Sequence, residues 1–370
     1  MYEDLVISIL REHEIDLVSS IPCDKAKDLC FMIPGSFNHV GLTREEDGIG
    51  VSAGAVLGGM RPTMVIQSSG LGNSLNALMS LSCTYHLPLP ILASWRGVQD
   101  EVIPAQIPFN RALPAILKST GIPCTLIRNH QDMEKIGDLI ENSFSNSTPH
   151  VGLILPGAWK GDETCWTGCR NDSRSRETAL HYKRVVRNPS MTRYEAIKVI
   201  AGYLDQQAAV SNIGVPSKEL YAALDRPLNF YMLGSYTQAS PIGLGLSQGT
   251  RRDVWVIDGD GSLLGTGILP VIATKKPRNL TIFCLDNGAF GSTGNQLTPA
   301  YRSADLELLA LGAGFTHTWK VEDKEGLNAV IQELKEGPNF VHVLLKPGNA
   351  DAKNIPLTPE QIRDRFKNAL

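Results

Sequence analysis

Short, nearly continuous apolar runs alternate with segments of helical periodicity in both halves of this chain. The runs predicted as strands are 16–21, 63–67, 89–94, 151–155, 208–211, 254–257, 280–285 and 339–345. Such alternation is typical of βαβ units, and strands that are apolar on both faces occur in parallel sheets covered by helices on each side. We therefore predict an α/β protein with two domains, each a parallel sheet flanked by helices.

A polar stretch rich in charge and serine separates the two halves. It lacks hydrophobic periodicity, so we predict a linker at 161–190 between a first domain, 1–160, and a second domain, 191–370. Thr192 is followed three residues later by Glu195, a capping-box pattern which predicts that the second domain opens with a helix.

The composition excludes several classes of protein. Apolar residues make up 42% of the chain and charged residues 20%, as in soluble globular proteins. A net charge of −3 provides no basic surface for nucleic acid or membrane lipid. No apolar run approaches the roughly 20 residues that span a bilayer, and the acidic N-terminus lacks the features of a signal peptide. We therefore expect no nucleic-acid partner and no membrane association.

The seven cysteines are odd in number and lie mostly in apolar stretches. Scattered thiols of this kind pack as small hydrophobic groups, and they indicate the reducing cytoplasm. Cys165 and Cys169 form the only close pair. A zinc site there would need two further ligands at fitting spacing, and none follows nearby, so we expect neither a metal nor a disulfide at this pair.

The most informative segments end two successive predicted strands, at 257–262 (IDGDGS) and 286–289 (DNGA). One crossover of about 25 residues returns the chain beside the first strand, which places Asp260 near Asn287 at the carboxyl edge of the sheet. Carboxylate, amide and backbone oxygens are hard ligands that suit Mg²⁺, with phosphate oxygens completing the octahedron. Ser262 is predicted to cap a helix whose N-terminal amides face phosphate.

Three other interpretations compete for this motif. A dinucleotide fingerprint is one residue too long, because the glycines are Gly259, Gly261 and Gly265, so a nicotinamide-linked dehydrogenase is disfavoured. An EF-hand loop fails because Leu263 and Leu269 stand where Gly and Glu are needed. A tight structural turn without a ligand stays open as the third alternative.

The Gly-Asp-Gly of residues 259–261 followed by Asn287 resembles the cofactor motif of thiamine diphosphate enzymes. By this resemblance thiamine diphosphate and Mg²⁺ are the cofactors. The implied metal ligands are Asp260, Asn287 and the carbonyl of Ala289, and the implied diphosphate contacts are Gly259, Asp260, Gly261, Ser262 and Asn287.

The first half is similar to the pyrimidine-binding domain of the same superfamily. Glu45 lies at the family's spacing from Gly54, and residues 67–73 (QSSGLGN) match the following turn and helix. The resemblance implies that Glu45 is catalytic, binding and polarising the pyrimidine ring, while Glu46 stays open as the alternative. Further implied cofactor contacts are Ser69, Gly70, Gly72, Asn73, Gly234 and Ser235.

The closer resemblance is to short members that decarboxylate sulfopyruvate or phosphonopyruvate and lack a middle domain. Matching segments in the first half are 68–73, 84–89, 95–97 and 103–108, similar to an α subunit, and in the second half 231–235, 239–243 and 292–296, similar to a β subunit. The resemblance implies a fusion of subunits that are separate chains in some methanogens. It also implies a homodimer or higher homo-oligomer with sites between subunits.

The implied reaction converts 3-sulfopyruvate to sulfoacetaldehyde and CO₂ in coenzyme M synthesis. Phosphonopyruvate decarboxylase, or another short 2-oxo acid decarboxylase, is the nearest alternative, and a cofactor-binding protein without activity is a remote one. A small anionic 2-oxo acid needs polar and cationic anchors, for which arginine's planar fork is suited. The candidates are Lys25, Arg44, Arg96 and Gln106, and a solvated surface charge is the alternative for each basic residue.

Two further assignments concern proton transfer and the shape of the cofactor. His86, in an apolar run, is a candidate for proton transfer or a packed histidine, whereas His317 and His342 are assigned no role. The family places an apolar side chain between the two cofactor rings, often in a Met-Gly pair where this chain has Tyr-Thr. The candidates for this wedge are Tyr236, Met232 and Leu233.

Overall fold

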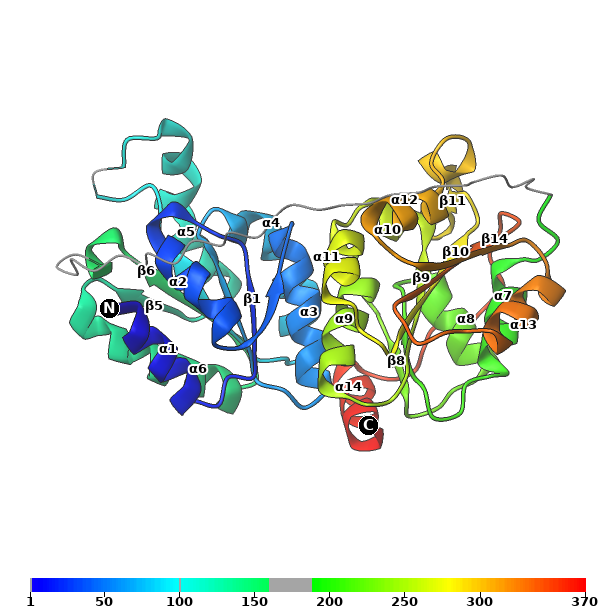
Figure 1. Cartoon of the computed structure of the whole chain (residues 1–370), viewed down its shortest axis with the longest axis horizontal. Helices are drawn as coiled ribbons and strands as arrows, with labels where there is room; N and C mark the ends of the chain where they lie inside the picture. Colours follow the sequence, from blue (N-terminus) through cyan, green and yellow to red (C-terminus); the bar gives the residue numbers. More distant parts are fainter. Residues whose placement is uncertain (1, 100, 160–187) are drawn as a thin grey trace.

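The computed structural model describes residues 2–99, 101–159 and 188–370. Within these residues the chain forms two α/β domains that lie side by side (Figure 1). Most of the predicted linker, and the Cys165–Cys169 pair, lie outside the described residues, so the predicted domain limits there stay predictions.

The first domain is built on a six-stranded parallel sheet in the order β2-β1-β3-β4-β6-β5. Its strands are β1 (Leu17–Ser20), β2 (Asn38–Gly41), β3 (Pro62–Gln67), β4 (Leu89–Ser94), β5 (Cys124–Ile127) and β6 (Pro149–Ile154). Its helices are α1 (Tyr2–Glu12), α2 (Lys27–Met32), α3 (Glu45–Leu57), α4 (Gly70–Ala77), α5 (Ile107–Thr120) and α6 (Lys135–Ser145). Every residue of β4 and β6 is buried, as expected for strands with both faces covered.

The second domain repeats this plan in the order β13-β14-β10-β9-β7-β8, again with every neighbouring pair parallel. Its strands are β7 (Ala208–Ser211), β8 (Asn229–Tyr231), β9 (Val254–Gly259), β10 (Leu280–Asp286), β13 (His317–Val321) and β14 (Asn339–Leu344). Its helices are α7 (Arg193–Ala201), α8 (Val215–Ala223), α9 (Ala239–Gly249), α10 (Asp260–Leu264), α11 (Ile268–Lys275), α12 (Leu306–Ala313), α13 (Lys324–Gln332) and α14 (Pro359–Ala369). A short hairpin, β11 (Ala289–Phe290) and β12 (Gln296–Leu297), follows β10.

These elements confirm the predicted fold class. All eight predicted strands are present, and α7 opens with the predicted capping box, in which Thr192 and Glu195 bond each other reciprocally. Within the two six-stranded sheets, the four strands that the sequence did not predict are the outer ones, β2, β5, β8 and β13; the short hairpin β11–β12 was not predicted either. No helix among the described residues is both long enough and apolar enough to cross a membrane.

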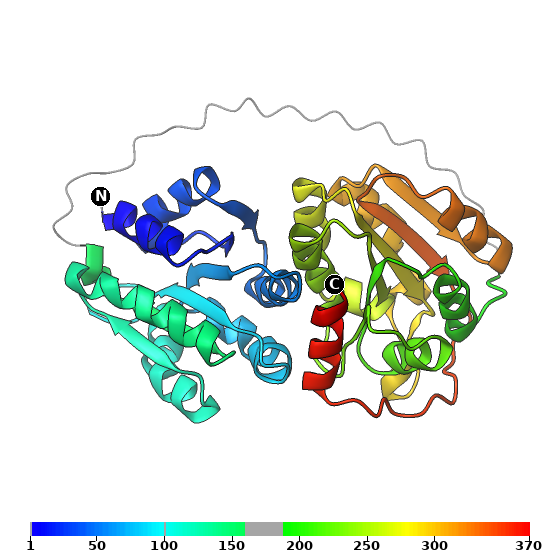
Figure 2. The ribbon, with the colours of Figure 1, turned by 90° about the horizontal axis from the view of Figure 1, so that it is seen from below.

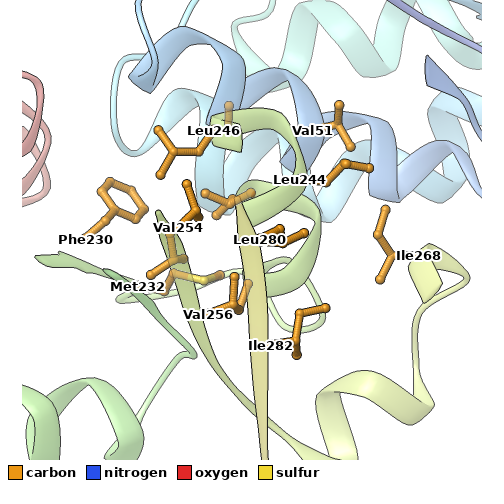
Figure 3. Close-up of a cluster of buried hydrophobic side chains, with 14 of the residues drawn as sticks. Val51, Phe230, Met232, Leu244, Leu246, Val254, Val256, Ile268, Leu280 and Ile282 are labelled. Carbon is orange, nitrogen blue, oxygen red and sulfur yellow. The ribbon is translucent and has the colours of Figure 1, made fainter. Parts of the chain in front are cut away.

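The two domains contact each other mainly through α3 and α9 (Figure 2). Glycines let these helices approach backbone to backbone, because a Cβ on Gly54 would overlap the Ile242 carbonyl and one on Gly245 would overlap that of Val51. Apolar side chains from both domains, including Val51 of α3 and Leu244 of α9, share one buried cluster (Figure 3). The interface between the domains is thus an extension of the core.

Hydrogen bonds join the N-terminal part of α3 to the second domain. Asp47 accepts bonds from the Thr266 hydroxyl (2.6 Å) and the Gly267 amide (3.1 Å), and Thr43 donates to the Gly267 carbonyl (3.0 Å). Thr266 and Gly267 closely follow α10, which begins where β9 ends. The start of α3 therefore faces the carboxyl edge of the second sheet, where open α/β folds bind ligands.

Candidate active site between the two domains

The second domain contributes a buried carboxylate at the start of α10. Strands β9 and β10 are neighbours, with Leu285 opposite Gly259, so their ends lie together as predicted. Asp260 is buried there and accepts a hydrogen bond from Thr298. Burial, and then the charge of Asp286, raise the pKa of Asp260 to about 6. A bound cation would offset both effects, so this carboxylate fits a metal ligand.

Asn287 supplies the second predicted ligand and is also buried. Its Oδ1 lies 3.3 Å from the Ala289 amide, which donates to it, while its Nδ2 has no partner among the described residues. A buried amide with an unused hydrogen-bonding atom is costly unless a ligand engages it. Among the described residues no group of three or more His, Cys, Asp or Glu could hold a metal. The predicted ligand set is instead one carboxylate, one amide and one backbone carbonyl.

His342, to which the sequence assigned no role, holds the turn that carries Asn287. Its Nε2 lies 2.8 Å from Asp286 Oδ2, and the Gly288 amide donates to Asp286 Oδ1 at 2.9 Å. These residues border a cavity of about 660 Å³ lined also by Tyr301 and Lys320 among others. Only the pairing of β10 with β14 places His342 here, so no local sequence signal could have identified it.

The glycines of the motif allow close approach, but the predicted helix cap is wrong. Gly259 is the N-cap of α10 with no side-chain bond, and Ser262 lies inside the helix, because the strand passes directly into the helix at Asp260. A Cβ on Gly261 would overlap the Phe290 ring, and the Gly261 carbonyl accepts a 2.6 Å hydrogen bond from Tyr236.

The segment after β8 contacts the first domain and contains the three candidates for the wedge. Ser235 Oγ lies 2.9 Å from Ser80 Oγ, and the neighbouring Gly234 packs against the same residue. Met232 is fully buried in the core, which disfavours it as the wedge. Leu233 and Tyr236 are both partly exposed and remain candidates.

In the first domain, Glu45 begins α3 and faces the start of α4. The Asn73 amide donates to Glu45 Oε2 at 3.0 Å, and Glu45 packs so closely on Gly70 that any Cβ there would overlap it. Glu46 instead is buried and accepts a 2.7 Å bond from Arg44. This difference favours Glu45 as the residue that would meet a cofactor, and it leaves Arg44 already paired.

Polar side chains at the ends of β3 and β4 form one network with the loop before α5. Ser69 donates to Gln106 (2.7 Å), and the Gln67 amide donates to Ser69 (2.6 Å). The Gln67 carbonyl in turn accepts a bond from Arg96 (3.3 Å). The structure therefore brings Arg96 and Gln106, two of the predicted anchors, together beside the helix start that carries Ser69. Gly72, one turn further along α4, packs against the Phe109 ring.

Arg96 is buried and already compensated by carboxylates that the sequence did not single out. Glu101 takes two hydrogen bonds, from Nε (2.6 Å) and Nη2 (3.0 Å), and Asp24 takes one from Nη1 (2.7 Å). The bond from Arg96 lowers the pKa of Glu101 to about 2. Burial raises the pKa of Asp24, but the charges of Arg96 and Lys25 outweigh burial and lower it overall. Lys25 itself is largely exposed and lies 3.4 Å from Asp24.

His86 lies away from these residues, which corrects its assignment as a catalytic group. It precedes β4, at the opposite end of the sheet, and its exposed ring bonds Glu360 of α14 at 3.1 Å. It borders a cavity shared with Val56 and Gly59 at the far end of α3, about 18 Å along the helix from Glu45. Apolar neighbours in the sequence did not reveal which end of the strand His86 occupies.

Comparison with known proteins identifies a matching protein family and similar decarboxylases. Residues 214–343 match the family described as thiamine pyrophosphate enzyme, C-terminal TPP binding domain. A sulfopyruvate decarboxylase from Methanosarcina acetivorans is 44% identical, covering 100% of this chain and 97% of that protein. A phosphonopyruvate decarboxylase from Streptomyces viridochromogenes is 30% identical, covering 95% of this chain and 91% of that protein.

Separate subunits and a solved structure are similar as well. The β and α subunits of sulfopyruvate decarboxylase from Methanothermobacter thermautotrophicus are 44% and 35% identical and cover 48% and 42% of this chain, and 94% and 96% of each subunit. A thiamin diphosphate-dependent enzyme structure from Mycobacterium smegmatis shares the fold, with a TM-score of 0.62, 15% identity, and 94% of this chain and 99% of that chain covered. The full-length similarity shows that the chain belongs to the sulfopyruvate decarboxylase family of thiamine pyrophosphate enzymes.

Proposed function

We propose that this protein is a carboxy-lyase that converts 3-sulfopyruvate to sulfoacetaldehyde and CO₂ with thiamine diphosphate and Mg²⁺, within coenzyme M synthesis. The observation that carries the proposal concerns helix α3. Its first residue, Glu45, packs against Gly70, and its Asp47 accepts a hydrogen bond from Thr266, which follows the Asp260 motif in the second domain. This contact supports a cofactor site to which both domains contribute residues. The full-length similarity to a sulfopyruvate decarboxylase supports the substrate.

The chain's own residues would have distinct tasks in this reaction. Asp260, Asn287 and the Ala289 carbonyl would hold Mg²⁺. Bound thiamine diphosphate would supply the electron sink for the carbanion left when CO₂ departs. Glu45 would hold a proton at its carboxyl and share it with the pyrimidine ring of the bound cofactor. Leu233 or Tyr236, the two remaining candidates for the wedge, would exclude water beside the reacting groups, which favours the loss of a charged carboxylate.

Location and assembly are part of the same proposal. The five cysteines among the described residues are free, which supports a cytoplasmic location. The resemblance implies that each site lies between subunits, and this expectation stays a prediction. The expected homodimer or higher homo-oligomer stays a prediction, which sedimentation at several protein concentrations would test.

An assay on 3-sulfopyruvate with and without added thiamine diphosphate and Mg²⁺ tests the function directly. We expect cofactor-dependent CO₂ release by the wild type. Glu45→Gln should lose at least about 100-fold in turnover, as expected for removal of a proton-transfer group, while still binding the cofactor by calorimetry. Unchanged turnover in Glu45→Gln would remove this residue from the mechanism, and binding without turnover in the wild type would favour a cofactor-binding protein without activity.

Phosphonopyruvate decarboxylation is the second candidate, supported by the 30% identical relative from Streptomyces. The two substrates differ in one tetrahedral anionic group. Measuring kcat/KM for both with the same enzyme preparation decides between them, and a higher value for phosphonopyruvate would replace our assignment.

A further inference from the structure

We propose that Asp24 and Glu101, the two carboxylates around Arg96, select the charge of the substrate and favour a singly charged sulfonate over a doubly charged phosphonate. This inference rests on the proposed function and deepens it. Asp24 is then a specificity-determining residue. Arg96, predicted as a free cation for the anionic group of the substrate, is instead already paired with two carboxylates.

Arg96 has little free capacity for an anion. Four of its hydrogen bonds go to Glu101, Asp24 and Gln67, and its side chain is only 5% exposed. The guanidinium thus carries one positive charge between two negative ones. Lys25 also reaches Asp24, but from the solvent side, where water and salt screen its charge. An incoming anion therefore meets two carboxylates wherever it meets Arg96.

The two carboxylates differ in how easily they can yield to a ligand. The Glu101 side chain is 7% exposed and holds Arg96 with two bonds, whereas the Asp24 side chain is 59% exposed and holds it with one. Exposed ion pairs contribute little to stability. Rotating the Asp24 side chain away from Arg96 into solvent therefore costs less free energy than breaking the two bonds between Glu101 and Arg96. We infer that the substrate's terminal anionic group takes the place of Asp24 on Nη1.

The network continues from Arg96 to Glu45, which places this exchange at the candidate active site. Gln67 links Arg96 to Ser69, and Ser69 directly precedes Gly70, which Glu45 touches. A 2-oxo acid bound beside this network would direct its keto group toward Glu45 and its far anionic group toward Arg96.

The charge of the ligand then decides how strongly the carboxylates oppose it. A sulfonate carries a single negative charge at neutral pH, whereas a phosphonate approaches two, as phosphate groups with a second pKa near 6 do. The repulsive Coulomb energy between the ligand and the two carboxylates, Asp24 and Glu101, is proportional to the charge of the ligand. It is therefore about twice as large for the phosphonate as for the sulfonate. Removal of one carboxylate charge should therefore help phosphonopyruvate more than sulfopyruvate.

The test compares kcat/KM for 3-sulfopyruvate and 3-phosphonopyruvate in the wild type and in Asp24→Asn. We expect the phosphonate-to-sulfonate ratio to rise about tenfold in Asp24→Asn, mainly through KM. Asp28→Asn removes the same charge four residues further along and should leave the ratio within twofold. Asp24→Glu restores the carboxylate and should return the ratio toward the wild-type value. Asp24→Ser provides the same test should the asparagine variant be unstable.

The outcomes separate this inference from the proposed function. A wild type that decarboxylates neither substrate overturns the proposed function. A wild type that decarboxylates sulfopyruvate, with an unchanged ratio in Asp24→Asn or an equal shift in Asp28→Asn, overturns charge selection by Asp24 and leaves the function standing.

Discussion

The hydroxyl of Thr266 donates a 2.6 Å hydrogen bond to Asp47, which joins the connection after α10 to the helix that carries Glu45. The carboxyl also accepts the Gly267 amide at 3.1 Å and is fully buried between the domains. Burial, only partly offset by these bonds, raises the pKa of Asp47 to about 6 from an ordinary 3.8.

This pKa predicts a dependence of stability on pH. The folded protein holds a proton that the unfolded chain loses between about pH 4 and pH 6. The stability contributed by this carboxyl is therefore complete below pH 4 and is lost as the pH rises through 6. Asp47→Asn carries no charge at any pH, so its free energy of unfolding relative to wild type should rise by up to about 3 kcal/mol from pH 4 to 7.5. Urea unfolding at both pH values measures this, and a constant difference would contradict it.

The contact of α3 with α9 predicts that Gly54 tolerates no side chain. A Cβ there would overlap the backbone carbonyl of Ile242, so Gly54→Ala should lower the free energy of unfolding by about 3 kcal/mol. Gly312→Ala is the matched control, because that helical glycine in α12 has nothing within 4 Å of the added carbon and should change stability by at most about 1 kcal/mol. Equal effects in thermal unfolding would refute the close packing.

Thr237 has a φ of +73°, a conformation that a β-branched residue rarely adopts. Its hydroxyl accepts a 3.0 Å bond from Gln238, which compensates only part of the cost. Thr237→Gly should therefore raise the free energy of unfolding by about 0.5–1 kcal/mol. Thr237→Ala keeps the Cβ, loses the bond and should show no gain, so a gain in the alanine variant would locate the effect elsewhere.

Asp260→Asn should have opposite effects with and without ligands. Without them it removes a buried charge beside Asp286 and should raise the melting temperature. With Mg²⁺ and thiamine diphosphate, which should stabilise the wild type, the variant should gain far less, because it lacks the charged ligand. Asp253→Asn, an exposed change at the opposite end of β9, is the control. Equal stabilisation by the ligands in both variants would exclude Asp260 as a metal ligand.

The fold was largely predictable from the sequence, and the degree of burial explains which strands the prediction missed. The predicted strands are all present, and they include every interior strand of both sheets, where burial on both faces requires continuous apolar residues. The outer strands escaped prediction because they are short or partly exposed: β2 and β5 each have a single fully buried residue. Half-exposed strands carry weaker apolar patterns than buried ones.

For the site, the sequence identified residues at strand ends but not their partners. Asp260 and Asn287 lie at neighbouring ends because a single crossover of ordinary length joins β9 to β10, and chain length alone predicts this. By contrast, Arg96 is paired with Asp24 across the sheet, and the sequence gives no sign of this pairing. His86 shows the same limit: its apolar neighbours in the sequence suggested a packed position, but its ring is exposed at the opposite end of the sheet.

What the sequence determined by itself is therefore the set of parallel strands and the polar residues that end them, since local periodicity and crossover length encode both. The tertiary structure alone decided which charges meet. The Arg96 cluster, the His342–Asp286 pair and the Asp47–Thr266 contact between domains join residues far apart in the chain. Their energies depend on burial and distance, which exist only after each domain has folded and, for Asp47–Thr266, after the two domains have packed together.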